Sequence, residues 1–596
     1  MSMGPDVPLS TSDATDPPRR PQSEGDLGFT RQRSVRWFQP GVLAIAAQRV
    51  LLSSAFGDFL DKRELQAASE AKVLSHHPVV GDAWIDYIAD TGDGFDPTYS
   101  IAWLTAQREL RVEGLDRPLP RAGLLVLGGD EVYPVPDSTE YDNRFRGPYR
   151  ASLPHTMQDS PQVVALPGNH DWYDGLTNFI RLFCSLADKW IGGRRTVQNR
   201  SYFAVRLTHD WWLWGIDIQF DAYIDDPQLQ YFRDVAQTMG QGARLILCTA
   251  KPSWTDVNAD PEAFRNLAYL ESRVIRPAGV RLLLSVSGDS HHYARYASED
   301  GRQKITAGGG GAFLHPTHHL DDSLNVPVDP VPGANTESYR LRHRYPAERR
   351  SRWMSLGAIG LPLRNLSFLA VPAVLYILLG WSSQFANRLL EQRLAGPFDQ
   401  SVENFGWFDE LMGLVRNPVS ILLLLVLVAG LVAFADPAIT WSRGWKGLVA
   451  KLAMGLTHFA MQLAVGLAVG LVAIEVASLV DGAMFVVVLV VALGLLGGLA
   501  GGFTLGFYLA VCCFALRAHV NEAFSSMALT SHKNFLRLHI DERGVLTVYS
   551  IGLNRPTKKW KLDRDDADPE APWLAPDGDG PHPHLIEAPI IINPHP

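Results

Sequence analysis

Four long apolar segments limit what this chain of 596 residues can fold into more than any other feature. They cover residues 365–383, 418–435, 452–474 and 483–516. A helix needs about 20 apolar residues to cross a bilayer, and a soluble core seldom contains several such segments in succession. The sequence therefore predicts an all-α transmembrane region with four helices within residues 346–517. The last segment has no charged residue and several glycines, and it is long for one crossing but short for two.

Basic residues are distributed unequally among the connections between these segments. Arg and Lys gather before the first segment, between the second and third, and after the fourth. The connection between the third and fourth has no Lys or Arg, and acidic residues outnumber arginines between the first and second. Because positive charge marks the cytoplasmic side, the pattern predicts a multi-pass membrane protein. Its large N-terminal soluble part and its C-terminus are both expected in the cytoplasm.

The two ends of the chain differ in pattern. Residues 1–29 are rich in Pro, Ser and Asp and are predicted to form a disordered tail. Residues 518–596 contain FLRLHI, DERG and VLTVYSIGL, which predict a β-hairpin in a small cytoplasmic C-terminal domain with a Pro-rich tail. The net charge of −9 gives no electrostatic reason to expect a nucleic-acid partner. The four cysteines include no CxxC pair and form no disulfide framework.

Residues 30–345 contain short apolar runs that are followed by polar residues. These runs are AWIDYIAD, GLLVLGGD, QVVALPGNHD, ARLILCTA and RLLLSVSGDSHH. Their length predicts buried strands of an α/β domain, and the intervening segments are long enough for helices. The carboxyl ends of such strands gather the ligand site. Because these ends repeatedly offer Asp, Asn and His, the pattern predicts a site for hard metal ions.

The order of D-x-G, GDxxY and GNHD resembles the calcineurin-like metallophosphoesterase superfamily, with the motif pattern of the purple acid phosphatases. The motifs stand in IADTGDG, GGDEVY and GNHD, and the resemblance covers about residues 82–295. It implies a two-sheet metallophosphoesterase sandwich with flanking helices. It also implies two divalent or mixed-valence metal ions, with Mn, Fe and Zn as candidates. The implied reaction is hydrolysis of a phosphomono-, phosphodi- or pyrophosphoester by metal-activated water.

The resemblance assigns metal ligands residue by residue. Asp90 and His291 match ligands of the first metal ion, and Tyr133 completes its shell or is a packed aromatic residue. Asp130 matches the carboxylate that bridges both metal ions. Asn169 matches a ligand of the second metal ion.

Three further positions decide whether the chain is expected to be active. His170 matches the residue beside the scissile phosphate that stabilises charge or protonates the leaving group. Asp289 stands at the first His of the family's GHxH block, where a carboxylate can still bind a metal ion. Ala250 stands where the family usually has a ligand His, so the second metal ion lacks one ligand. The sequence thus favours an active enzyme, with a catalytically degenerate phospholigand-binding or signalling protein as the alternative.

Other side chains are candidates for the same site. His292, His315 and His318 are candidate supplementary ligands or substrate contacts, or polar loop residues. Arg144 and Arg146 are candidates for holding the substrate phosphate, or solvated loop residues. The lipid bilayer is a predicted partner of the membrane region. The substrate classes left open include a lipid-linked phosphate and a nucleotide, and the oligomeric state is also left open.

Overall fold

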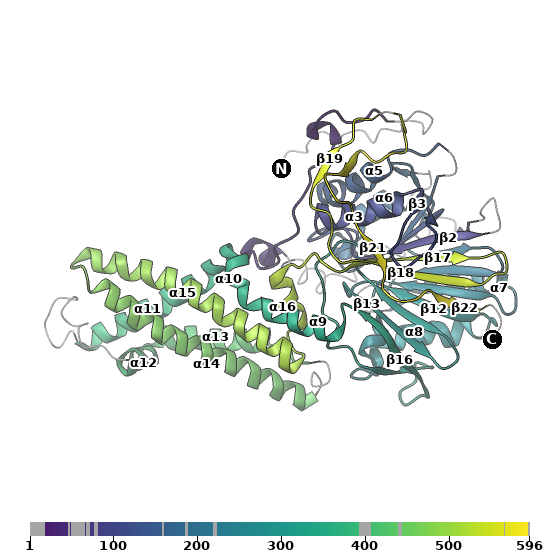
Figure 1. Cartoon of the computed structure of the whole chain (residues 1–596). Helices are drawn as coiled ribbons and strands as arrows, with labels where there is room; N and C mark the ends of the chain where they lie inside the picture. The colour runs from purple at the N-terminus through teal and green to yellow at the C-terminus, as the bar shows by residue number, and fades with distance from the viewer. Residues whose placement is uncertain are drawn as a thin grey trace.

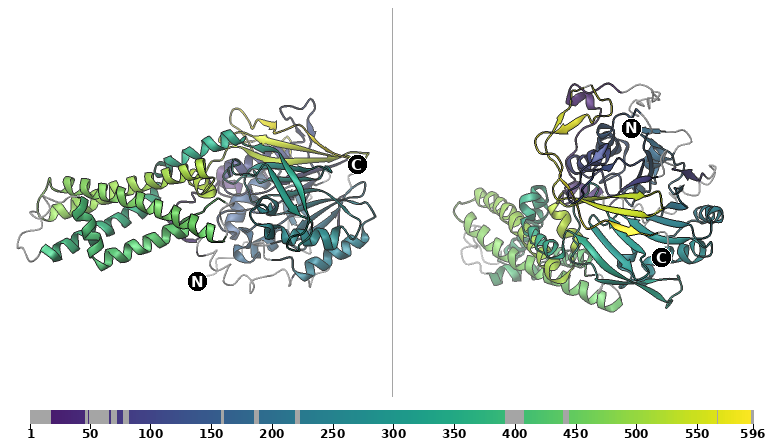
Figure 2. Two further views of the ribbon diagram at one scale, coloured as in Figure 1. Left: turned by 90° about the horizontal axis from the view of Figure 1, so that it is seen from below. Right: turned by 45° about the vertical axis from the view of Figure 1, so that its right-hand side comes forward.

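The computed structural model describes residues 18–45, 48, 66, 72–76, 82–157, 160–184, 189–218, 223–391, 407–438, 444–565 and 567–593. Two large sheets with helices form one body, and an elongated bundle of apolar helices lies beside it (Figures 1 and 2). Residues 1–17 of the predicted tail lie outside the described residues. Residues 18–29 are packed rather than detached, because Leu27 is buried and Arg20 donates to four backbone carbonyls within residues 563–572.

One nine-stranded sheet combines strands from both ends of the chain. Its strands, in spatial order, are β21 (Pro583–Leu585), β18 (Leu546–Leu553), β17 (Lys533–Ile540), β2 (Ala83–Ile88), β5 (Leu124–Leu127), β6 (Gln162–Ala165), β8 (Arg194–Thr196) and β7 (Lys189–Ile191), with β22 (Ile590–Ile592) also paired to β18. Strands β2, β5 and β6 are parallel neighbours. Strand β17 pairs antiparallel with β2 on one side and with β18 on the other.

The region predicted as a small C-terminal domain is therefore continuous with this sheet. Strands β17 and β18 are the two strands of the predicted hairpin. Seven of the eight residues of β17 are buried, as expected of a central strand with apolar neighbours on both faces. Arg537 is buried in this strand, where its Nε and Nη2 donate to the carboxylate of Asp86 in β2 at 2.7 and 2.8 Å.

The second nine-stranded sheet carries the rest of the α/β body. Its strands, in spatial order, are β1 (Leu74–Ser75), β9 (Phe203–Arg206), β10 (Trp211–Ile216), β11 (Arg244–Thr249), β12 (Arg281–Ser287), β14 (Gln303–Ala307), β13 (Tyr293–Ser298), β16 (Thr336–Tyr345) and β15 (Ser323–Pro327). Strands β10, β11 and β12 are parallel. Buried side chains of both sheets share one hydrophobic core, which includes Ile85 and Leu538 from the first sheet and Leu213 and Ile246 from the second.

Short ladders and helices complete this body. The ladders are β3 (Glu109–Leu110) with β4 (Leu119–Pro120), and β19 (Trp560–Leu562) with β20 (Leu574–Pro576). The main helices are α3 (Phe95–Ala106), α5 (Gly147–Ser152), α6 (Thr177–Phe183), α7 (Asp226–Thr238) and α8 (Arg265–Leu270). Helix α7 begins where the Asp225 side chain accepts a hydrogen bond from Gln228 N, which satisfies one of the free amides of its first turn.

Helices form most of the described part of the apolar region. Its helices are α9 (Glu348–Met354), α10 (Leu361–Arg364), η9 (Leu366–Leu369), α11 (Ala370–Glu391), α12 (Trp407–Arg416), α13 (Pro418–Phe434), α14 (Gly444–Ala477), α15 (Ala483–Val511), η11 (Cys512–Leu516) and α16 (Val520–Met527). Helix α14 and the continuous stretch Ala483–Leu516 are long and apolar enough to cross a membrane. The bent pair Glu348–Arg364 and Leu366–Ser382, at 70°, makes a third if it counts as one span. Helix α13 has 17 residues, so the predicted count of four is matched only in part.

Glycines let the helices of the bundle approach closely, and a hydrophobic junction joins the bundle to the sheets. A side-chain carbon added at Gly497 would lie 2.5 Å from the Tyr376 ring, and one at Gly501 would lie 2.7 Å from Pro372. At the junction, Phe313 of the α/β body shares a buried cluster with Leu509 of α15. The end of the bundle is thereby held against the loop that follows β14.

Candidate active site

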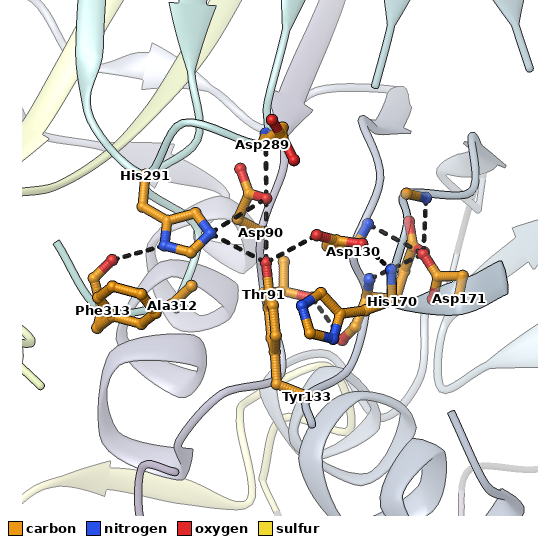
Figure 3. A network of polar contacts seen from close by, with 12 residues as sticks. Asp90, Thr91, Asp130, Tyr133, His170, Asp171, Asp289, His291, Ala312 and Phe313 are labelled. Carbon is orange, nitrogen blue, oxygen red and sulfur yellow. Dashed lines mark hydrogen bonds and ion pairs between the residues drawn. The ribbon is translucent and has the colours of Figure 1, made fainter. Parts of the chain in front are cut away.

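Polar residues that follow four parallel strands meet at one edge of the two sheets. Asp90 follows β2, Asp130 follows β5 and Asn169 follows β6, all in the first sheet. Asp289 and His291 follow β12 in the second sheet. The sheets meet here directly, because Asp289 N donates a 3.1 Å hydrogen bond to Asp90 Oδ1 (Figure 3). The structure thus brings together the five side chains that the motifs single out, as carboxyl strand ends do in α/β proteins.

The three aspartates share an uncommon backbone conformation. The φ angles are 57° at Asp90, 54° at Asp130 and 62° at Asp289. A left-handed φ at a residue other than glycine costs about 1–3 kcal/mol and persists where the surroundings impose it. Such strain gathers at functional sites, so its recurrence at three converging carboxylates marks this edge of the sheets.

The Tyr133 hydroxyl connects the two sides of the site. It lies 3.1 Å from each of Asp90 Oδ1, Asp130 Oδ2 and His291 Nε2 (Figure 3). His291 Nδ1 donates to Phe313 O at 2.8 Å. That bond fixes the tautomer and leaves Nε2 as the free acceptor, which faces the Tyr133 hydroxyl at 3.1 Å with Asp90 Oδ1 at 3.7 Å. A histidine that binds a metal ion is oriented in the same way.

Negative charge is concentrated at this point. Burial, followed by the neighbouring carboxylates of Asp130 and Asp289, raises the pKa of Asp90 well above its ordinary value. Burial also raises the pKa of Asp130. Within the described part of the chain, Asp90 Oδ2 and Asn169 Oδ1 are buried without a hydrogen-bond partner. Buried carboxylates this close require a compensating cation or protons, and oxygen donors with an imidazole suit hard or borderline metal ions.

The arrangement as it stands is not a closed metal cage. Among the described residues, no group of three or more His, Cys, Asp or Glu side chains is arranged so that it could hold a metal ion. The Tyr133 hydroxyl instead makes contact with the groups that would surround a first metal ion. The donor set and its orphaned oxygens nevertheless fit the implied metal ions, with Asp90, Asp130, Tyr133 and His291 on one side. Asp130, Asn169 and Asp289 are the donors available to a second ion.

His170 lies beside the carboxylates without facing them through its ring. Its backbone N donates to Asp130 Oδ1 at 2.8 Å, and its Nδ1 donates to Pro134 O at 3.1 Å. Burial lowers the pKa of His170 to about 4, so the ring is neutral at pH 7. Its Nε2 is the nitrogen left for a ligand.

Asp171 stabilises the site through hydrogen bonds to the backbone of its loops. This residue was not identified from the sequence. Its Oδ2 accepts hydrogen bonds from Asp130 N at 3.0 Å and Gly168 N at 2.8 Å. Its Oδ1 accepts a 2.5 Å hydrogen bond from the Tyr141 hydroxyl. The last residue of GNHD therefore fastens the loops after β5 and β6 together. The signal that could have revealed it is its place in that motif.

The glycine-rich loop after β14 has a packing role at the site. A side-chain carbon at Gly308 would lie 2.3 Å from Asp90 Oδ2, and one at Gly310 would lie 2.4 Å from Ala89 O. The loop also donates to the backbone of this strand end, from Ala312 N to Asp90 O at 2.9 Å. Only glycine permits the loop to pass this close to Asp90.

The three additional histidines occupy different positions. The His315 ring stacks on His291 with 3.9 Å between centroids, and it lines the cavity beside the site. His318 lies away from the aspartates, because its ring nitrogens contact Ser351 Oγ at 3.0 Å and Cys513 O at 2.9 Å. His292 is buried but is not among the residues that line the cavity.

The two candidate arginines bind elsewhere. Arg144 is buried and donates to Arg33 O, to Asp93 O and to the Glu140 carboxylate, so it fastens the N-terminal segment. Arg146 forms an ion pair with Asp142 at 3.2 Å. Neither lines the cavity at the site, so neither is positioned in this structure to hold a phosphate there.

A cavity of about 640 Å³ opens at the site and extends toward the helices. Asp130, Asn169, His170, Asp289 and His291 line one end of it. Trp37 and Phe38 also line it, although nothing in the sequence distinguished them from other aromatic residues of a polar segment. The Trp37 ring makes edge contacts with Tyr133, His170 and Phe313 at centroid distances of 5.6 to 5.9 Å.

Ala250 has no side-chain atom that could bind a metal ion near Asp130. A side-chain carbon at Gly129 would lie 3.1 Å from the methyl group of Ala250, which places Ala250 next to the turn after β5. Its carbonyl accepts a hydrogen bond from Gly288 N at 3.1 Å, so the turns after β11 and β12 are joined. In comparisons with known proteins, no family model matches the chain and no curated protein matches it.

Proposed function

We propose that this chain is a membrane-anchored, metal-dependent phosphoesterase with a two-sheet metallophosphoesterase sandwich. One observation carries the proposal. Three aspartates with left-handed backbones, of which Asp90 and Asp130 are buried and Asp289 is half-buried, meet at one edge of the sheets. Asp130 and Asp289 line one end of a ligand-sized cavity there, together with Asn169 and His291. No Lys or Arg of the described residues lines that cavity, so the charge of a bound phosphoester requires a cation from solution.

The residues of the site have separate tasks in this proposal. Bound metal ions would supply activated water and neutralise phosphate charge. Asp130 holds its position through His170 N, and His291 is oriented by Phe313 O. His170 is neutral when the site is empty, since its pKa is about 4. A phosphate beside its Nε2 raises that pKa, which lets the ring stabilise charge or give a proton to the leaving oxygen.

The apolar helices supply the membrane anchor in this proposal. Strand β2 precedes them and β17 follows them, yet the two strands pair over five residues. Both strands therefore lie on the same side of the membrane, and the number of crossings between them is even. Two crossings by α14 and α15 satisfy this condition, and four crossings satisfy it if α11 and α13 also span. The distribution of basic residues supports the cytoplasm as that side.

The alternative is a catalytically degenerate protein that binds a phospholigand. The alanine at position 250 favours it, because the side of Asn169 then lacks the imidazole that the family usually supplies. A single bound metal ion would hold a phosphate without activating water efficiently.

A substrate panel separates the two functions. The purified full chain is loaded with Mn²⁺, Fe or Zn²⁺ and assayed on nitrophenyl phosphate, bis-nitrophenyl phosphate and pyrophosphate. We expect metal-dependent hydrolysis of at least one of these, abolished by a chelator and restored by the metal ion. Bound metal ions without hydrolysis on any substrate would support the degenerate protein instead.

A further inference from the structure

The cavity at the candidate site has two chemically different ends. One end consists of Asp130, Asp289 and Asn169 with the histidines His170, His291 and His315. The other end lies among the apolar helices and is formed by Phe368 of η9, Val371, Pro372 and Leu375 of α11, Leu427, Leu431 and Phe434 of α13, and Leu505 of α15. A single cavity thus runs from the site of the proposed chemistry to helices with the composition of membrane segments.

Aromatic rings connect these two ends. Trp37 contacts His170 with 5.6 Å between ring centroids. The next residue, Phe38, contacts Phe368 with 5.3 Å between centroids. Both line the cavity, so its wall stays apolar from the edge of the site to the first turn of the helices.

The wall suits an apolar group better than a nucleoside. Among the described residues it carries no Lys or Arg to bind additional phosphates. Its polar groups beyond the site are uncharged apart from the acidic Glu522 and the titratable His458, and they include Gln462, Asn521 and Ser525. Gln462 is already used within the bundle, because the Tyr376 hydroxyl donates to its Oε1 at 2.6 Å. A water-soluble head would leave the large apolar wall without a matching surface.

We infer that the substrate is a phosphoester of a long hydrocarbon chain, which rests on the phosphoesterase function proposed above. The phosphate would lie at the end of the cavity formed by Asp130 and His170, where bound metal ions would neutralise its charge. The hydrocarbon chain of the substrate lies along Leu375 and Leu431, between α11 and α13. Hydrolysis of an alkyl phosphate breaks the bond between phosphorus and the ester oxygen of the hydrocarbon chain. Water supplies the new oxygen on phosphorus and a proton to the released alcohol. In an alkyl nitrophenyl phosphate the bond to the nitrophenyl oxygen breaks instead, and the alkyl phosphate is the other product.

The test is a homologous series of esters that differ only in chain length. Butyl, octyl, dodecyl and hexadecyl esters carry the head that the panel identifies, either phosphate or nitrophenyl phosphate. They are presented in detergent micelles at a fixed mole fraction to the metal-loaded full chain. Each buried methylene is worth up to about fourfold in binding. We expect kcat/KM to rise from butyl to dodecyl, by up to about fourfold for each methylene that moves from water into the apolar wall.

Matched variants show whether the hydrocarbon chain of the substrate lies in this cavity. Leu431→Trp and Leu375→Trp fill the wall, whereas Leu425→Trp and Val374→Trp add the same ring at exposed positions of the same helices. The first pair should reduce the ratio of dodecyl to butyl kcat/KM toward one, and the second pair should leave that ratio unchanged. Because all four proteins meet the same micelles, partition of the long esters into detergent cannot produce this difference.

The outcomes separate the two proposals. Equal kcat/KM for all chain lengths would overturn the lipid inference while leaving the phosphoesterase intact. A chain-length dependence that Leu431→Trp and Leu375→Trp do not alter would also overturn it. Absence of hydrolysis for every ester with metal ions bound would remove the proposed function, and this inference with it.

Discussion

Asp130 uses both carboxylate oxygens to join the parts of the candidate site. Its Oδ1 accepts the backbone hydrogen bond of His170, and its Oδ2 lies 3.1 Å from the Tyr133 hydroxyl. Gly168 makes room for it, since a side-chain carbon there would lie 2.1 Å from Oδ1. This geometry suits a ligand shared by two metal ions.

Substitutions at Asp130 and His170 should therefore have different consequences. Asp130→Asn removes the shared negative charge, so both metal binding and hydrolysis should be lost. His170→Ala should retain the metal ions and reduce kcat by about 10²–10⁴ on alkyl esters, the usual contribution of acid–base assistance. Nitrophenyl esters should suffer less, because their leaving group needs no proton. Metal content by mass spectrometry and phosphate-release rates measure both effects.

The matched control is Asp142→Asn, which changes a half-exposed aspartate outside the site. It should leave metal content and rate at the wild-type level. An empty metal site in His170→Ala, or an undiminished rate on alkyl esters, would show that the role of His170 is misassigned.

Single residues also show where sequence reasoning ends. Motif spacing was sufficient to predict that Asp90, Asp130 and His291 lie close together. Each of them follows a strand, and the carboxyl ends of these strands face the same edge of the two sheets. The same reasoning could not indicate the direction of Arg144 or the partners of His318. Those depend on the N-terminal segment and on the end of the helical bundle, which are distant in sequence.

At the scale of elements, strand β17 joins the C-terminal part of the chain to the sheet that its N-terminal part forms. It enters the first sheet beside β2 although about 450 residues separate the two strands, as the Arg537 and Asp86 pair shows. Local alternation predicted the hairpin of β17 and β18. It could not predict that β2 would be the partner, because strand pairing over this distance leaves no local pattern in one sequence.

The buried pair of Arg537 and Asp86 should account for much of the stability of this junction. Arg537→Met leaves the Asp86 carboxylate buried without its partner, which should lower the free energy of unfolding by about 3–5 kcal/mol. The double variant Arg537→Met with Asp86→Leu should recover most of that loss, because no unpaired charge remains. Urea unfolding of the full chain, followed by tryptophan fluorescence, measures these changes.

The control for this series is Arg543→Met. Arg543 is exposed, and its nearest carboxylate is 3.7 Å away, so the change should stay within about 0.5 kcal/mol. A loss in Arg537→Met no larger than that of the control would contradict the role given to the buried pair.

For the whole molecule, the sheets set a condition on the membrane region. Apolar composition alone predicted four crossings, whereas two described helices have the full length and α13 has 17 residues. Length could not reveal the 70° bend between Glu348–Arg364 and Leu366–Ser382, because bends depend on packing against neighbours. If these helices cross a membrane, the pairing of β2 with β17 requires that the number of crossings between the two strands is even.

Topology reporters distinguish the two even numbers. Reporters at the N-terminus and after Pro596 should both report the cytoplasm. A reporter inserted near Asp399 should report the far side if α11 and α13 cross the membrane, and the cytoplasm if only α14 and α15 cross. Termini on opposite sides would contradict the even number and, with it, the shared sheet.

The most direct measurement of the central claim follows metal content and hydrolysis in the same sample. The full chain is stripped with a chelator, titrated with Mn²⁺, and assayed at each step for bound metal and for phosphate release. We predict two unequal affinities, with the tighter ion held by Asp90, Asp130, Tyr133 and His291. Hydrolysis should appear as the weaker ion binds, and neither event should occur in Asp130→Asn. Full occupancy without hydrolysis of any phosphoester, or hydrolysis that persists in metal-free Asp130→Asn, would contradict the account.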